Sequence, residues 1–196
     1  MNVSRETEEL FSHYEQLLIK WNSAINLVSP ATLPNLRDRH IDDSAQLWDL
    51  SMPTAGRWVD LGSGGGLPGI VISIMAQRQD VDITLVESDQ RKATFLRTVV
   101  RELDLRRVTI LSRRIEDIEP LSADFLSARA LAPMAGLLPM ISRHLNRDGQ
   151  VWLLKGAQWR EECRVVQQSW RFNLRRFPSR TNPDAAILNI SGVSHA

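Results

Sequence analysis

The sequence predicts an α/β protein in which a mostly parallel, seven-stranded sheet follows an N-terminal helical extension. From residue 57 onward, short apolar runs alternate with segments of helical periodicity, a pattern typical of parallel strands joined by crossover helices. Before that point, apolar side chains recur three and four positions apart, as in amphipathic helices. We therefore expect residues 1–50 to form helices packed on the core and residues 51–196 to form the sheet, within one compact unit.

Length and composition bound the class of protein. A chain of 196 residues suffices for one α/β domain, and its 43% hydrophobic and 24% charged residues argue against a disordered chain. No run of ~18 apolar residues predicts a membrane span, and the acidic N-terminus, with Glu6 and Glu8, is unlike a signal peptide. The single cysteine, Cys163, excludes an internal disulfide and a cysteine-based zinc site. We expect a cytoplasmic protein without a metal and, since no heptad seam is visible, a monomer.

The first helix is predicted over residues 4–28. Apolar side chains there keep helical spacing, and Ser4 is placed to cap the helix, with acidic residues near its positive end. Ser29 and Pro30 end this segment, and Pro34 interrupts the one that follows. The apolar positions are Leu10, Tyr14, Leu17, Leu18, Trp21, Ile25 and Val28.

A second helix is predicted over residues 39–50. Within it His40, Asp43 and Ser44 are spaced i, i+3 and i+4, so they share one face beside Arg39. Such a set is either a local hydrogen-bond cluster or part of a functional site, and the residues alone leave both open. The side chains expected to turn inward are Ile41, Leu47 and Leu50.

A glycine-rich turn, VDLGSGGGLPGI at residues 59–70, follows the first predicted strand at residues 58–61. Glycines let the backbone approach a ligand closely, and the helix after the turn offers unpaired N–H groups at its positive end. The turn matches G-x-G-x-x-G through Gly64, Gly66 and Gly69, a pattern that alone fits NAD, FAD or no ligand at all.

Acidic residues around the turn favour S-adenosylmethionine. Asp60 lies two positions before the first glycine, where a carboxylate suits a positively charged amino group better than a pyrophosphate. Glu87 ends the second predicted strand, where it can hydrogen-bond the ribose hydroxyls of an adenosine. Glu116 and Asp117 follow the third strand and are either exposed loop acids or neighbours of an adenine amino group. No second βαβαβ half is present to seat a nicotinamide.

The later strands are predicted from short apolar runs at residues 83–87, 108–111, 125–128 and 151–155. A helix around residues 157–170 then leads to two more strands, at residues 172–177 and 186–191. Because a proline-containing connection joins these last two strands, we expect a hairpin-like pair at the edge of the sheet.

Arginines cluster locally although the net charge is only +1, which does not itself indicate a nucleic-acid-binding protein. The clusters are either solvated helix faces or a basic rim for a phosphate backbone. They comprise Arg37 and Arg39, then Arg106, Arg107, Arg113 and Arg114, and finally Arg160, Arg164, Arg171, Arg175, Arg176 and Arg180.

Several segments, in order from Trp21 to Gly156, resemble those of the ribosomal small-subunit methyltransferase G family, formerly called glucose-inhibited division protein B. The most specific parts are the R-H-x-x-D-S segment at residues 39–44 and the G-x-G-x-G-x-P-G turn at residues 62–69. The other segments are NLVS at 26–29, VES at 86–88 with RK at 91–92 and FL at 95–96, ARA at 128–130 and LKG at 154–156.

This resemblance implies a class I methyltransferase, Rossmann-like in fold, that transfers the methyl group of S-adenosylmethionine to guanine N7 in the decoding-centre loop of 16S ribosomal RNA. The family's cofactor positions fall on Gly62, Leu67, Ile115, Glu116 and Arg129. To these the residue-level argument adds Asp60, Gly64 and Glu87. Residues 179–184 depart from the basic stretch that many members have there, which weakens the case for RNA contacts by this tail.

The acceptor side is expected to need no general base, because guanine N7 carries a lone pair and no proton. Asp43, oriented by His40, is the candidate carboxylate that stabilises the positive charge moving onto the purine. Arg129 would hold the methionine carboxylate or the target base, and Lys155 a phosphate or guanine O6. The candidate substrate-binding residues are Asn26, Arg37, Arg39, Ser44 and Lys155.

Two other functions stay open on the sequence. One is a methyltransferase acting on a small molecule or on another RNA, which the arginine clusters and the segments outside the glycine turn disfavour. The other is a non-catalytic RNA-binding or ribosome-assembly factor, against which the intact turn with Asp60 and Glu87 argues.

Overall fold

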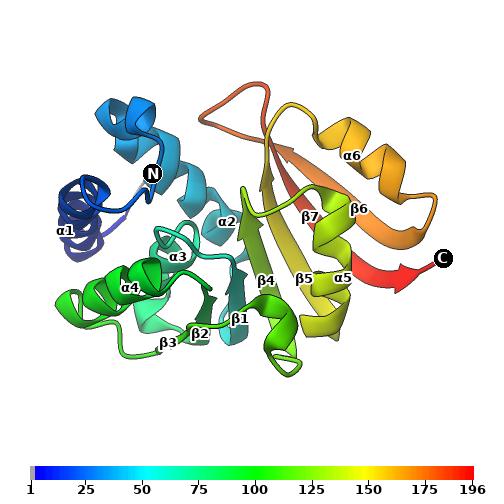
Figure 1. Cartoon of the computed structure of the whole chain (residues 1–196), viewed down its shortest axis with the longest axis horizontal. Coiled ribbons are helices and arrows are strands. Elements are labelled where there is room, and N and C mark those ends of the chain that lie inside the picture. Colours follow the sequence, from blue (N-terminus) through cyan, green and yellow to red (C-terminus); the bar gives the residue numbers. More distant parts are fainter. Residues whose placement is uncertain (1–2) are drawn as a thin grey trace.

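Seven strands form one mixed sheet in the computed structural model, which describes residues 3–196 (Figure 1). Their order is β3-β2-β1-β4-β5-β7-β6. Strands β1 to β5 pair in parallel, whereas β7 is antiparallel to β5 and β6, which confirms the parallel sheet and the edge hairpin. The strands are β1 (Ala55–Leu61), β2 (Asp80–Val86), β3 (Val108–Leu111), β4 (Ala123–Arg129), β5 (Leu145–Lys155), β6 (Trp170–Pro178) and β7 (Ala186–His195).

Helices cover both faces of the sheet (Figure 1). Four of them pack into one apolar layer and two into the other. The first layer has α1 (Arg5–Asn22), α2 (Asp43–Ser51), α3 (Gly69–Met75) and α4 (Gln90–Glu102). The second has α5 (Met134–His144) and α6 (Trp159–Val166). Short helical turns are η1 (Pro30–Asn35), η2 (Arg37–Asp42), η3 (Ala76–Arg78) and η4 (Ile115–Asp117).

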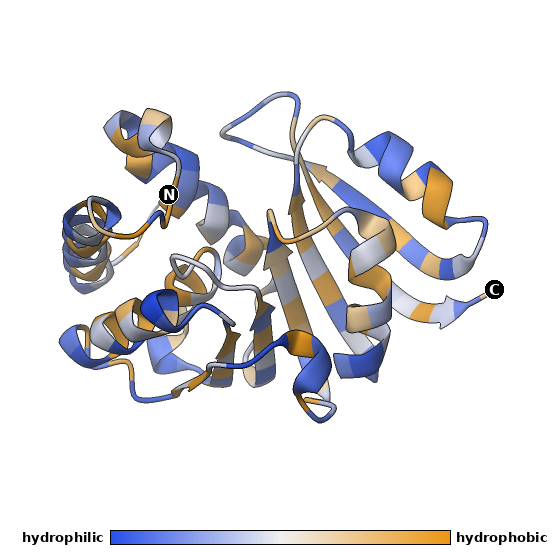
Figure 2. Cartoon of the chain, viewed as in Figure 1, coloured by the Kyte–Doolittle hydropathy of each residue, from blue (hydrophilic) through white to orange (hydrophobic). Residues whose placement is uncertain are grey.

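Alternate strand residues feed the two layers, because successive side chains of a strand point to opposite faces. In β1, Trp58 packs on the α1–α4 side, and Val59 and Leu61 pack on the α5–α6 side. Figure 2 shows hydrophobic residues along the central strands and hydrophilic ones in the outer turns. Because these strands are buried on both faces, they contain runs of consecutive apolar residues. This explains why short apolar runs in the sequence predict them.

The first helix is shorter than predicted and ends at Asn22 instead of residue 28. The Asn22 side-chain oxygen accepts hydrogen bonds from the backbone N–H groups of Leu27 and Val28, at 3.0 and 2.9 Å, and so turns the chain back. Val28 is still buried in the same apolar layer, which is why its spacing continued the helical pattern. The cap at Ser4 is confirmed, since its hydroxyl accepts from the Thr7 N–H.

The second predicted helix begins with a wider turn. Residues Arg37–Asp42 are π-helical, and the α-helix proper is Asp43–Ser51. π-helical turns are rare and frequently occur at functional sites. Pro34 does not separate two elements as expected but lies inside the 3₁₀ helix Pro30–Asn35.

The N-terminal helices are fastened to the sheet domain by polar and apolar contacts. The Tyr14 hydroxyl, fully buried on α1, donates to the carbonyl of Gly65 at 2.5 Å. Phe11, Leu18 and Ile41 share one apolar layer with Trp58 of the sheet. The glycine turn is therefore supported from the N-terminal side. No helix within residues 3–196 is long and apolar enough to cross a membrane.

Candidate active site

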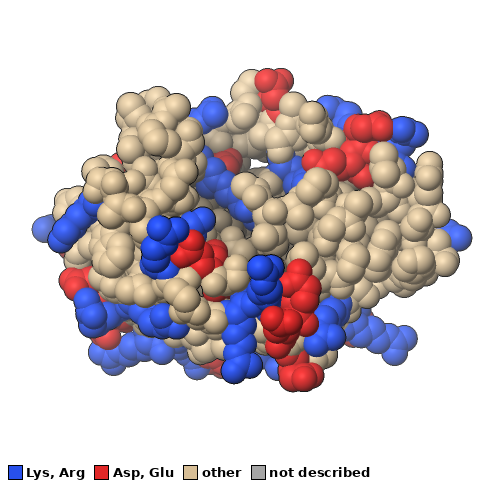
Figure 3. All heavy atoms as spheres, in the orientation of Figure 1, with Lys and Arg blue, Asp and Glu red and all other residues tan. Residues whose placement is uncertain are grey.

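Two clefts lie beyond the carboxyl ends of the parallel strands and share residues 129–131, the last residue of β4 and the two that follow it. The first, of about 520 Å³, is the glycine-turn cleft, and the second, of about 510 Å³, is the Asp43 cleft. Open parallel sheets bind ligands at this edge. Figure 3 shows a hollow near the centre of one face with basic atoms beside it.

Seven of the eight predicted cofactor residues line the glycine-turn cleft. They are Gly62, Gly64, Leu67, Glu87, Ile115, Glu116 and Arg129. Three basic side chains that the sequence did not single out as cofactor residues, Lys92, Arg113 and Arg114, line it as well.

The glycine turn exposes its backbone to this cleft. Gly62 has φ +66°, and a Cβ there would lie 2.5 Å from the Leu131 side chain. Gly64 has φ +57° and open space beyond it, since a Cβ would meet only the Gly62 carbonyl, at 3.8 Å. A ligand can therefore approach the main chain at Gly64, and glycine accepts the left-handed conformation at both positions without strain.

Asp60 does not line the cleft, contrary to the sequence-based expectation. Its side chain is fully buried and accepts hydrogen bonds from the Ser127 hydroxyl at 2.6 Å and the Gly69 N–H at 3.2 Å. Burial raises the pKa of this carboxyl to about 6, although the bonds from Ser127, Ser63 and Gly69 oppose that shift. Asp60 therefore links β1 to β4 and to the start of α3. It stabilises the conformation of the glycine turn without facing the cleft.

Glu87 stands at the end of β2 with its carboxylate shared between two backbone groups. One oxygen accepts from Gly64 N–H at 2.8 Å and the other from Asp89 N–H at 2.7 Å.

Across the cleft, Ile115 is fixed by His144, whose Nε2 lies 3.1 Å from the Ile115 carbonyl. His144 is fully buried on α5, and no sequence signal marked it as a support of the site.

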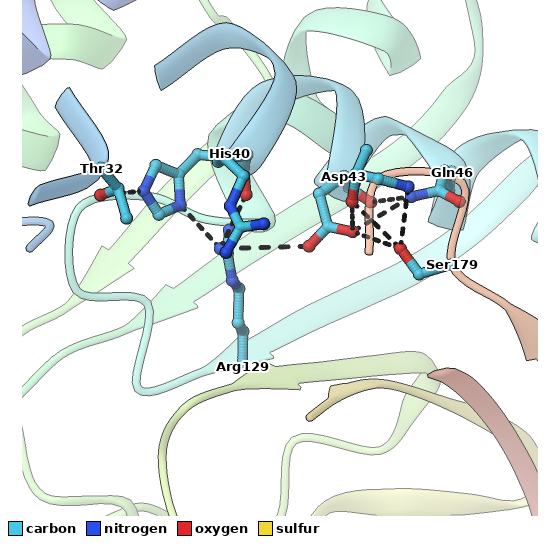
Figure 4. Close-up of polar contacts among 8 residues, drawn as sticks. Thr32, His40, Asp43, Gln46, Arg129 and Ser179 are labelled. Atoms are coloured by element: carbon cyan, nitrogen blue, oxygen red, sulfur yellow. Dashed lines mark hydrogen bonds and ion pairs between the residues drawn. The ribbon is translucent and has the colours of Figure 1, made fainter. Parts of the chain in front are cut away.

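Arg129 closes β4 at the boundary of the two clefts (Figure 4). Its Nη2 donates to the Arg39 carbonyl at 3.1 Å, lies 2.6 Å from His40 Nδ1 and is 4.0 Å from Asp43 Oδ2. Its Nη1 is buried and has no hydrogen-bond partner among the described residues. One end of the guanidinium is thus anchored, and the other retains unused donors.

His40 is the neutral partner of Arg129. Because a guanidinium only donates, Nδ1 must accept, and Nε2 then carries the proton and donates to the Thr32 hydroxyl at 2.7 Å (Figure 4). Burial, with Arg129 as the next largest cause, lowers the pKa of His40 to about 4. The imidazole is therefore uncharged at neutral pH.

Asp43 is oriented by the C-terminal loop, whereas the sequence suggested His40 for that role. Its Oδ1 accepts from Thr181 at 2.7 Å, Ser179 at 3.0 Å and Gln46 at 3.1 Å, while Oδ2 faces Arg129 (Figure 4). Within residues 3–196 the side chains of His40 and Asp43 share no hydrogen bond, and each instead contacts Arg129. The two hydroxyls lie in the segment that departs from the family pattern, so no motif in the sequence marked them as site residues.

Lys155 faces the Asp43 cleft beside a carboxylate that the sequence did not single out. The Lys155 ammonium is 2.6 Å from Glu162 Oε2 and donates to the Ala132 carbonyl at 3.2 Å. The same Glu162 oxygen accepts from the Met134 N–H at 2.8 Å. Both side chains line the cleft.

Four other predicted substrate residues line neither cleft. Arg37 donates to both oxygens of Glu8 at 2.7 Å and to Asp42 at 2.9 Å, so it joins η2 to α1. Ser44 is fully buried, whereas Asn26 and Arg39 are exposed. Among the described residues no group of His, Cys, Asp and Glu is placed to hold a metal.

Comparisons with known proteins agree over most of the chain. Residues 7–182 match the family model of rRNA small subunit methyltransferase G. The ribosomal RNA small subunit methyltransferase G of Paracoccus denitrificans is 50% identical over 196 residues, covering 100% of both chains. The protein of the same name from Cereibacter sphaeroides (strain ATCC 17025) is 46% identical over 197 residues, covering 100% of this chain and 94% of the relative.

Solved structures agree in fold. An S-adenosylmethionine-dependent methyltransferase from Aquifex aeolicus superposes with a TM-score of 0.63 at 13% identity, covering 90% of this chain and 96% of that one. A ribosomal protein L11 methylase from Lactobacillus delbrueckii gives 0.63 at 16% identity, with 79% and 78% covered. At such low identity the likeness concerns the class I methyltransferase fold alone.

Proposed function

The chain belongs to the rRNA small subunit methyltransferase G family, and we propose that it transfers a methyl group from S-adenosylmethionine to N7 of guanosine 527 in 16S ribosomal RNA. The observation that carries this proposal is the pair of clefts that meet at Arg129. One has the glycine turn of a nucleoside cofactor site, and the other adjoins it on the acceptor side. We expect the protein to act as a monomer in the cytoplasm.

The glycine-turn cleft fits S-adenosylmethionine. The buried, unused donors of Arg129 Nη1 suit a ligand with an amino acid carboxylate, and the lack of a side chain at Gly64 lets that ligand lie close to the turn. Glu87 and Glu116 would accept from ribose hydroxyls and the adenine amino group at the other end of the cleft. Asp60 contributes from beneath the turn and does not touch the ligand. When bound, S-adenosylmethionine supplies an electrophilic methyl group on a positively charged sulfur.

The Asp43 cleft would receive the guanine base. Guanine N7 has an in-plane lone pair and no proton, so the chain need only position the base and stabilise the charge that it gains. Asp43 supplies a fixed negative charge, because three donors hold its Oδ1 and leave Oδ2 toward the boundary of the clefts. A preorganised charge of this kind costs no reorganisation during the reaction.

A labelling experiment tests this function. Small ribosomal subunits that lack the modification are incubated with the protein and methyl-tritiated S-adenosylmethionine, with naked 16S RNA and large subunits in parallel. N7-specific chain cleavage followed by reverse transcription then maps the labelled base. We expect label at one guanosine of 16S RNA, and its absence from every RNA tested would refute the proposal.

Asp43→Asn separates acceptor chemistry from cofactor binding. We expect the rate of methyl transfer to fall about 100-fold. Cofactor affinity measured by calorimetry should change far less than the rate, because Asp43 does not line the glycine-turn cleft and is linked to it through the Arg129 guanidinium. Asp38→Asn is the matched control, since Asp38 is exposed nearby and lines neither cleft. A wild-type rate for Asp43→Asn would remove Asp43 from the mechanism.

A further inference from the structure

Lys155 and Glu162 form a partly buried ion pair in the wall of the Asp43 cleft. The Lys155 side chain is 10% exposed and that of Glu162 is 23% exposed, so both are largely withdrawn from water. Lys155 ends β5, the neighbour of the strand that carries Arg129, and Glu162 comes from α6. Two independent elements therefore bring opposite charges to one place in this cleft.

Each partner keeps unused hydrogen-bonding capacity. Lys155 has three N–H donors; one donates to the Ala132 carbonyl, and the ammonium also lies in ion-pair contact with Glu162. Glu162 engages only Oε2, which accepts from the Met134 N–H and forms the ion pair with Lys155, while Oε1 has no partner among the described residues. The pair thus presents one free donor beside one free acceptor.

We propose that Glu162, together with Lys155, selects guanine in the acceptor cleft, an inference that rests on the proposed function. The six-membered ring of guanine carries the O6 acceptor next to the N1–H and 2-amino donors. Lys155 donates to O6, and Glu162 Oε1 accepts from N1–H and the 2-amino group. Adenine carries a 6-amino donor and an N1 acceptor at these positions, so it faces like groups on both sides.

This mode of recognition leaves N7 available. N7 belongs to the five-membered ring, and neither Lys155 nor Glu162 pairs with it in this arrangement. A cleft wall that hydrogen-bonds specific groups also rejects bases lacking them, because its own buried polar atoms are then left unpaired. Selection of the base and access to the methyl acceptor are therefore compatible.

A purely structural role is the alternative, because Glu162 Oε2 also holds the first backbone N–H of α5. That role depends on Oε2 and does not discriminate between bases. Recognition by Oε1 does discriminate, so the two roles differ in their dependence on the 2-amino group of the target.

The test replaces the target guanosine by inosine, which lacks only the 2-amino group. Small subunits are reconstituted with 16S RNA ligated to carry either nucleoside, and single-turnover rates of methyl transfer are compared. The wild-type protein should methylate inosine about tenfold more slowly or worse. In Glu162→Ala the rate with guanosine should fall, and the guanosine-to-inosine ratio should approach one.

Glu161→Gln is the matched control, because Glu161 is exposed on the same helix and pairs only with Arg164. It should keep the wild-type ratio. Equal wild-type rates on guanosine and inosine would overturn the inference even if Glu162→Ala failed to fold, and so would an unchanged ratio in a folded Glu162→Ala. A wild-type protein that methylates neither substrate would instead contradict the proposed function.

Discussion

His40 is held neutral next to a permanent cation, and this arrangement fixes the orientation of Arg129. Nδ1 of His40 accepts from Arg129 only while it is unprotonated, and Thr32 fixes the tautomer from the other side. A charged imidazole would face the guanidinium with like charge. The same geometry that directs Arg129 therefore makes the folded state sensitive to acid.

We expect His40 to stabilise the protein above pH 6.5 and to lose that contribution as the pH falls toward 4. The unfolded side chain has a pKa near 6.5 and the folded one about 4, so the unfolded state binds more protons in this window. Between pH 7 and pH 5 the wild-type free energy of unfolding should fall by about 2 kcal/mol more than that of His40→Gln. Urea unfolding at both pH values measures this difference.

His40→Gln is suitable because glutamine keeps an acceptor for Arg129 and does not titrate. Asp60 is present in both proteins, so the opposing effect of its raised pKa cancels in the comparison. Equal losses of stability in the two proteins would mean that His40 titrates at its ordinary pKa.

The sequence singled out residues but not the contacts between them. The sequence identified Arg129, His40 and Asp43, but a separation of 89 positions hides the bond between Arg129 and His40. Asp60 was assigned to the cofactor because it precedes the glycines. In a strand, however, alternate side chains face opposite layers, and Asp60 points toward α3, where Gly69 and Ser127 satisfy it.

The loop between β6 and β7 forms part of the wall of the Asp43 cleft. It is held on α2 by Ser179 and Thr181 at Asp43, and by Arg180, whose N–H donates to Gln46 and whose guanidinium pairs with Asp49. The loop thus sets the orientation of a carboxylate 136 positions away in the sequence.

Removing the two loop hydroxyls should lower the rate of methyl transfer without changing the affinity for the cofactor. In Ser179→Ala/Thr181→Val, Oδ1 of Asp43 keeps only the bond from Gln46, so the carboxylate loses its fixed orientation. We expect a rate roughly tenfold lower and unchanged cofactor affinity. Single-turnover transfer and calorimetry measure the two quantities. Thr94→Val/Ser142→Ala removes two exposed hydroxyls away from both clefts and should behave as wild type.

An undiminished rate in the loop variant would show that Gln46 alone orients Asp43.

The sequence did predict the edge hairpin, because its strands and its proline-containing connection are local signals. It did not predict the contact of the loop with α2, which depends on tertiary packing. Nor did it show that α1 ends at Asn22, since Val28 keeps the helical spacing while lying outside the helix.

The whole molecule combines its N-terminal helices and its sheet in one apolar layer. Trp21 of α1 packs on Phe95 of α4, with ring centroids 5.6 Å apart, and Trp58 lies fully buried in β1. A separate domain of residues 1–50 would need its own core, which this shared layer replaces. The prediction of one compact unit rests on the length of the chain, because two independent domains would be cramped in 196 residues.

We therefore expect urea to unfold the protein in a single cooperative transition. Tryptophan fluorescence and far-ultraviolet circular dichroism should give coincident curves. A chain lacking residues 1–50 should lose its near-ultraviolet circular dichroism signal. The deletion exposes the apolar side of α3 and removes the hydrogen bond from Tyr14 to the glycine turn. Two resolved transitions in the full chain would instead indicate two independent folding units.

Arg129 belongs to the walls of both clefts, so in the proposed reaction we expect the affinities of the cofactor and the target base to be thermodynamically linked. If binding of the cofactor changes the affinity for the base by some factor, binding of the base must change the affinity for the cofactor by the same factor. A carboxylate drawn to Nη1 also offsets the guanidinium charge felt by Asp43 at Nη2. We therefore expect cooperativity between the two substrates that arises from a single shared side chain and requires no movement of the backbone.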